Sequence, residues 1–147
     1  MSRDGRGRGL RLSEHEAQRR FATASVARLA TTGPDGQPHL VPVTFAADGG
    51  HIYTAVDGKP KSSRQLRRLR NIAANPRVAV LADHYEPDWD SLWWVRADGH
   101  ASILSEPGDL AGPLRLLAAR YPQYRASLPD GPVIHIQVDR WSGWAAS

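Results

Sequence analysis

A short basic segment carries more net positive charge than the whole 147-residue chain, +6 against +4. It lies within GKPKSSRQLRRLRNIAANPRV and runs from residue 59 to residue 70, with no acid among its six cations: Lys59, Lys61, Arg64, Arg67, Arg68 and Arg70. The start of a helix offers unpaired backbone N–H groups and the positive end of the helix dipole, so it attracts anions. Lys59, Lys61 and Arg64 flank an expected helix start, and Ser62 and Ser63 add hydroxyl donors. The segment therefore predicts a phosphate site, although a solvated helix face is the alternative.

The other reactive side chains form no recognised catalytic or metal-binding pattern. The absence of cysteine excludes disulfides, thiolate zinc sites and cysteine nucleophiles. No two of the six histidines are spaced i, i+4, and no HxH or HxxE pattern occurs, so we predict no metal site. The serines lack a nucleophile-elbow context, and there is no P-loop. We therefore name no catalytic residue.

Two adjacent tryptophans, Trp93 and Trp94, fall on one expected strand. Neighbouring side chains on a strand face opposite sides, so one indole can enter the core while the other lies on a surface or a subunit interface. The alternative is that both are core or rim residues.

Composition indicates a single folded domain, because 41% of the residues are hydrophobic and the length suits one core. Residues 1–11 are rich in glycine and arginine and predict a disordered basic arm, which leaves a domain over residues 12–147. We expect neither a membrane-spanning helix nor a signal peptide, and hence a cytoplasmic protein. The positive charge is concentrated rather than spread over a face, so we do not expect nucleic-acid binding.

Periodicity predicts about six strands and three helices, which suggests a small antiparallel barrel with flanking helices. Ser13 is a good N-cap for the first helix, and Asn75 before Pro76 should end the second. Asp-Gly dipeptides indicate tight turns, and Gly99 indicates a bulge in a long strand. The expected strands are 26–32, 39–46, 51–56, 77–83, 92–104 and 133–141, and the expected helices begin near residues 14, 63 and 107.

The order of these elements resembles the split β-barrel flavin and deazaflavin oxidoreductases, the superfamily of pyridoxamine 5′-phosphate oxidase. The resemblance covers roughly residues 13–144 and is sharpest from Lys61 to Val80, where a lysine, a basic helix, Asn-Pro, an arginine and a strand follow one another. Within the superfamily the chain is most similar to the small branch that uses the deazaflavin coenzyme F420.

The resemblance implies a mainly β fold, a six-stranded antiparallel split barrel with flanking helices. It also implies a homodimer with two cofactor sites at its interface. The implied phosphate-binding residues are Lys59, Lys61, Ser62, Ser63 and Arg64. The residues implied to lie along the cofactor ring are His39, Val41, Pro42 and Val43, with Thr54 and Ala55 nearby.

The expected function is F420-dependent hydride transfer to or from a small unsaturated or conjugated organic substrate. In such proteins the cofactor does the redox chemistry and the chain supplies position and electrostatics. Arg67 and Arg68 exceed what one phosphate needs and suit the longer, more anionic F420. FMN remains the alternative cofactor, and a non-catalytic carrier of a flavin, deazaflavin or tetrapyrrole remains the alternative function.

Overall fold

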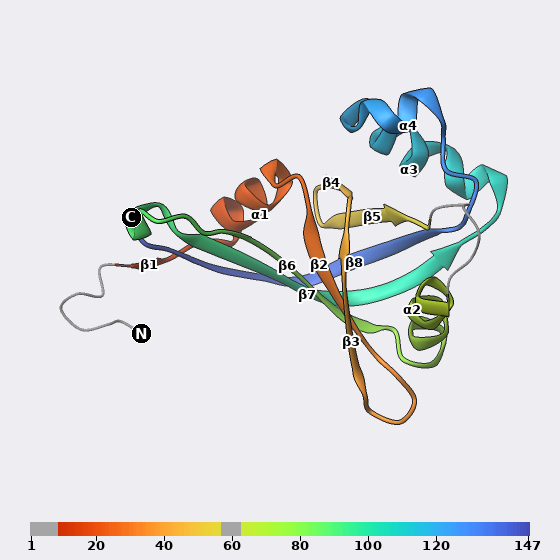
Figure 1. Ribbon diagram of the computed structural model, residues 1–147, viewed down its shortest axis with the longest axis horizontal. Helices are drawn as coiled ribbons and strands as arrows, with labels where there is room; N and C mark the ends of the chain where they lie inside the picture. Colours follow the sequence, from red (N-terminus) through yellow and green to blue (C-terminus); the bar gives the residue numbers. More distant parts are fainter. Residues whose placement is uncertain (1–8, 57–62) are drawn as a thin grey trace.

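One strongly curved antiparallel sheet dominates the computed structural model, which describes residues 9–56 and 63–147 (Figure 1). The strands follow the spatial order β3-β2-β6-β7-β8-β5-β4, and β1 pairs with β8. Their bounds are β1 Leu10–Arg11, β2 Ala27–Thr32, β3 Pro38–Val43, β4 Ala46–Asp48, β5 His51–Ala55, β6 Arg77–His84, β7 Trp93–Leu104 and β8 Val133–Ala145. The predicted antiparallel barrel is confirmed, and the short strands β1 and β4 are added to the six predicted ones.

The strand predicted over residues 39–46 is divided at a corner. β3 ends at Val43 and β4 begins at Ala46. Between them the Phe45 ring is buried in the core, and the Phe45 backbone forms hydrogen bonds with side chains instead of a neighbouring strand. The Tyr121 hydroxyl contacts the Phe45 nitrogen at 3.1 Å, and Arg120 donates to the Phe45 carbonyl at 2.8 Å. These long-range bonds replace strand pairing at the corner.

In the part of the chain that the structure describes, four α-helices accompany the sheet: α1 Glu14–Thr23, α2 Ser63–Ala74, α3 Pro107–Arg120 and α4 Pro122–Ala126. A short 3₁₀ helix spans Trp89–Ser91. The Ser13 hydroxyl accepts from the Glu16 nitrogen at 3.1 Å, which confirms the predicted N-cap. The predicted third helix is divided into α3 and α4, because Tyr121 precedes a proline and leaves the α region. No helix in the described ranges is long and apolar enough to cross a membrane.

The predicted turns and bulge are confirmed. Gly36 and Gly49 have φ of 84° and 61°, the left-handed region that tight turns require. The β7–β8 register shifts between Asp98 and Gly99, so a bulge interrupts the longest pairing in the sheet.

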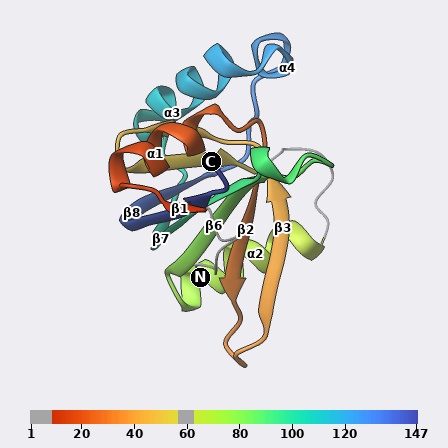
Figure 2. The same ribbon diagram turned by 90° about the vertical axis from the view of Figure 1, so that its left-hand side faces the viewer.

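The core lies on the concave side of the sheet and is closed by α1, while α1, α3 and α4 group above the strands in Figure 2. The Phe21 ring lies 4.7 Å from the Phe45 ring and 5.2 Å from that of Trp141, measured between centroids. All three side chains are buried, so helix, corner and last strand share one aromatic cluster.

Leu10 and Arg11, which belong to the predicted arm, form β1 and pair with Ala145 and Trp144 of β8. The rest of the predicted arm, residues 1–8, lies outside the described residues.

Candidate functional site

Arg68 is a buried cation on α2, with 8% of its surface exposed. Its Nε atom has no hydrogen-bond partner and its guanidinium has no ion-pair partner among the described residues. Burial lowers the pKa of Arg68 below its usual value, because desolvation disfavours the charged form. A buried charge without a counter-ion is costly, so an anion brought in from outside would be stabilised here.

Asn71 ties this part of α2 to the sheet. It lies one helical turn beyond Arg68 and is 3% exposed, and its Nδ2 donates to the Thr31 hydroxyl of β2 at 3.0 Å. Thr31 in turn pairs with His39 of β3 in the strand register. The packing therefore brings Arg68, Asn71 and Thr31 of two elements together, with His39 on the neighbouring strand.

The helix of the predicted phosphate site begins where the sequence places it, since Ser63 is the first residue of α2 and Arg64 the second. Lys59, Lys61 and Ser62 lie outside the described residues. Their role at the helix start remains a prediction.

The predicted ring-contacting residues divide between two faces of the sheet. The register pairs Val43 and Val41 with Ala27 and Leu29, and all four are buried or packed against the core. His39 lies two residues before Val41 on β3, so its side chain points to the same side of the sheet as those of Val41 and Val43.

Pro42 pairs with the exposed Arg28 on the opposite face, and on β5 Thr54 is 3% exposed while Ala55 alternates to the other side. The side chains of His39, Val41, Val43 and Thr54 thus share the concave side, whereas those of Pro42 and Ala55 do not.

An open hollow of about 370 Å³ lies between α2 and the β2–β3 turn, and Arg68 is not among its lining residues. Arg67, Arg70 and Asn71 line it from the helix, and Asp35 and Gln37 from the turn. The Asp35 carboxylate accepts from the Gln37 nitrogen at 3.0 Å, and no ion pair joins Arg67 or Arg70 to an acid in the described ranges. The hollow therefore has two further cations available for a ligand.

A signal for Arg68 as the central cation is present in the sequence. The apolar Ile72 lies four residues after Arg68, and residues at i and i+4 share a helix face. Ile72 is 3% exposed, so Arg68 is a cation on the buried face rather than part of a solvated one. Arg68 lies beyond the first turn of α2, so a prediction confined to the helix start does not include it.

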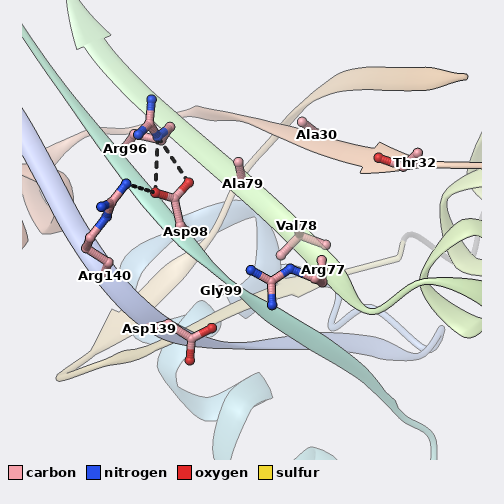
Figure 3. A pocket seen from close by; sticks show the side chains of 10 residues that line it. All are labelled: Ala30, Thr32, Arg77, Val78, Ala79, Arg96, Asp98, Gly99, Asp139 and Arg140. Atoms are coloured by element: carbon pink, nitrogen blue, oxygen red, sulfur yellow. Dashed lines mark hydrogen bonds and ion pairs between the residues drawn. The ribbon is translucent and has the colours of Figure 1, made fainter. Parts of the chain in front are cut away.

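The convex face of the sheet carries a second, larger hollow of about 650 Å³, shown in Figure 3. Asp98 at its edge accepts from Arg96 at 3.0 Å and lies 3.6 Å from Arg140, so these three side chains form one network (Figure 3). Arg77 stands apart from this network in the same view.

Trp93 and Trp94 face opposite sides, as predicted. Trp93 packs against the core, and the Arg20 guanidinium lies 6.0 Å from its ring centroid. Trp94 is partly exposed on the convex face beside Arg96.

The histidines offer one close pair. The His51 Nδ1 and His135 Nε2 atoms lie 2.9 Å apart on β5 and β8, and the Tyr53 ring stacks on that of His135 at 4.9 Å. Within the described ranges, no three potential metal ligands gather.

Comparison with known proteins matches this architecture to one family. The family described as pyridoxamine 5′-phosphate oxidase matches residues 13–145, nearly the whole described domain. The crystal structure of a FAD-binding protein from Mesorhizobium loti superposes with a TM-score of 0.75 at 24% identity, covering 95% of this chain and 99% of that one. The conserved protein Rv2991 from Mycobacterium tuberculosis superposes with a TM-score of 0.74 at 26% identity, covering 92% and 86%.

A curated relative matches over a shorter stretch. It is a 5a,11a-dehydrotetracycline/5a,11a-dehydrooxytetracycline reductase from Streptomyces rimosus, 41% identical over 56 residues. The match spans 38% of this chain and 38% of the relative's length. The extent of the family match and the split-barrel topology agree, and the chain belongs to the pyridoxamine 5′-phosphate oxidase family.

Proposed function

We propose that this protein is an oxidoreductase that binds the deazaflavin coenzyme F420 and transfers a hydride between it and a small unsaturated or conjugated organic substrate. The observation that carries the proposal is Arg68, a buried guanidinium with no acidic partner in the described part of the chain. Family membership supports cofactor-dependent redox chemistry. The partial match to a reductase of an organic compound supports hydride transfer from the cofactor to the substrate.

In this proposal Arg68 holds the cofactor phosphate. A guanidinium forms bidentate, charge-assisted hydrogen bonds to phosphate, and burial makes such bonds stronger. The Asn71–Thr31 hydrogen bond fixes the helix turn that presents Arg68. The predicted donors at the start of α2, Lys59, Lys61, Ser62, Ser63 and Arg64, would extend the same anion site.

The cofactor ring lies along β3 and β5 in this proposal. Val43 and Thr54 are buried and can support the ring from beneath. His39, Val41, Pro42 and Ala55 are at least partly exposed, so their side chains can contact it. The bound deazaflavin supplies the hydride, and these residues orient the ring and exclude water from it. No catalytic side chain is required.

The hollow between α2 and the β2–β3 turn favours F420 over FMN. F420 has a phosphodiester and a glutamate tail, whereas FMN ends in one phosphate. Arg67 and Arg70 line this hollow without acidic partners in the described ranges, so a second anion would gain charge-assisted contacts there. FMN would leave these two cations unused.

We further propose a homodimer whose interface includes the convex face of the sheet at its β3 edge, around Leu40. Leu40 is 66% exposed, and a large apolar side chain open to solvent on a sheet face suits a protein interface. A cytoplasmic location remains a prediction from the sequence.

The test of the function is reoxidation of reduced F420. The purified protein, reduced F420 and a set of conjugated enones are mixed, and the return of the oxidised deazaflavin absorbance is followed. The proposal expects protein-dependent reoxidation with at least one substrate and none with enone alone. Tight binding of reduced F420 without reoxidation across the set would favour the carrier, and turnover supported by reduced FMN alone would contradict the cofactor assignment.

A further inference from the structure

A separate hollow of about 530 Å³ lies at the other end of the sheet, where β1, β7 and β8 meet. Its walls combine aromatic rings with cations, and six of its side chains matter for binding: Arg11, Trp94, Arg96, Arg140, Ser142 and Trp144. Figure 1 shows β1 and α2 at opposite ends of the molecule. This hollow is therefore distinct from the Arg68 site of the same chain.

Two tryptophans supply flat apolar walls. Trp94 and Trp144 are direct partners in the β7–β8 register, so both indoles project from the convex face side by side. Trp94 also lines a neighbouring hollow of about 310 Å³, which places its ring between two open spaces. Gly9 lies so close to the Trp144 ring that any side chain at position 9 would collide with it.

The polar lining is cationic and incompletely paired. Arg11 has no ion-pair partner in the described ranges, and Arg96 and Arg140 share the single carboxylate of Asp98. Glu14 is the one acid that lines the hollow itself. The Ser142 hydroxyl is buried and has no hydrogen-bond partner among the described residues. A buried polar atom without a partner indicates a position where a ligand atom can bond.

We propose that this hollow binds a planar organic anion, of which an aromatic carboxylate is the simplest form. The ring would stack against Trp94, because indole offers a large polarisable face. The carboxylate would accept charge-assisted hydrogen bonds from Arg11 and Arg140. The Ser142 hydroxyl would gain the partner that it lacks.

This binding does not rest on the proposed cofactor function. Ala101, whose nitrogen bonds the Pro76 carbonyl at the α2 end of the sheet, lies seven residues along β7 from Trp94. At about 3.3 Å per residue, roughly 23 Å of strand separates these two residues. The hollow is therefore a site apart from Arg68 of the same chain.

The test is calorimetric titration of the full chain with 2-naphthoate and with 2-naphthalenemethanol, which keeps the ring and removes the charge. The naphthoate should bind at least ten-fold tighter. Arg11→Gln and Arg140→Gln should each weaken naphthoate binding several-fold, and Trp94→Leu should weaken both ligands about ten-fold.

Matched controls lie outside the hollow. Arg77→Gln removes an exposed arginine from the same sheet face, and Trp89→Leu removes a tryptophan that is 73% exposed. Both should bind naphthoate as the wild type does. Equal affinities for the two ligands, no binding of either, or equal losses in Arg11→Gln and Arg77→Gln would each overturn the proposal. If Trp94→Leu fails to fold, the two arginine variants still decide the outcome.

Discussion

At the scale of single residues, the surroundings of His135 disfavour its protonated, charged form. Burial lowers the pKa of His135 from its ordinary value of 6.5, and the neighbouring His51 and His100 lower it further. The unfolded chain therefore takes up this proton at a higher pH than the folded chain does. Stability from this site is complete above about pH 6.5 and is lost as the pH falls through the lowered pKa.

Replacing His135 should reduce the acid sensitivity of the fold. The wild type should lose stability between pH 7 and pH 5, and one site contributes at most about 1.4 kcal/mol per pH unit. His135→Gln should flatten this slope in urea unfolding curves, whereas His15→Gln, at an exposed position of α1, should leave it unchanged. Identical slopes in wild type and His135→Gln would refute the assignment.

At the scale of elements, the bulge at Gly99 lets β7 and β8 stay paired along their length. A Cβ at Gly99 would meet the Gln137 carbonyl oxygen well inside contact distance, so the backbone would have to move. Gly99→Ala should therefore destabilise the protein by about 2 kcal/mol or more, as other strained core substitutions do.

Gly108 on α3 is the matched control, because a Cβ there meets nothing within 4 Å. Gly108→Ala should be neutral or stabilising by up to about 1 kcal/mol, since alanine favours the helix. Equal denaturation midpoints for the two variants would show that the bulge tolerates a side chain.

Local chemistry accounts for the elements that could be predicted from sequence. The Ser13 cap, the Asn75-Pro76 helix end and the Gly99 bulge each depend on neighbours in the chain. The corner at Phe45 was not predictable, because it depends on Tyr121 and Arg120, more than 70 residues away.

The candidate site likewise combines features that can be read from the sequence with features that depend on tertiary packing. The basic helix is readable from its composition, but two features of Arg68 are tertiary facts: its burial, and the lack of an acidic partner in the described ranges. The strand alternation separates Pro42 from Val41 and Val43, and it could be read from the sequence. Which side of the barrel receives a ligand could not.

At the scale of the whole molecule, the convex face predicts self-association. Leu40→Glu places a charge at the proposed interface. Leu128→Glu is the control, because it places a charge away from the sheet, at a residue that is 55% exposed between α4 and β8. The wild type should sediment as a dimer at micromolar concentration. Leu40→Glu should weaken the dimer by roughly thirty-fold or more, since central interface residues contribute at least about 2 kcal/mol. A monomeric wild type, or equal effects of the two variants, would contradict the proposed dimer.

The proposed function depends most directly on what Arg68 binds. Fluorescence titration should compare F420 and FMN on the wild type, on Arg68→Met, and on Arg115→Met, whose arginine is exposed on α3. Methionine keeps the apolar stem and removes the charge, so the fold should persist. Lys61→Ala in the same series tests the predicted donors at the helix start.

Charge-assisted hydrogen bonds are worth about 1.5–3 kcal/mol, so Arg68→Met should weaken F420 binding by at least about ten-fold. Arg115→Met should bind as the wild type does, and the wild type should prefer F420 to FMN. Equal F420 affinities of Arg68→Met and Arg115→Met would contradict the claim that Arg68 holds the cofactor.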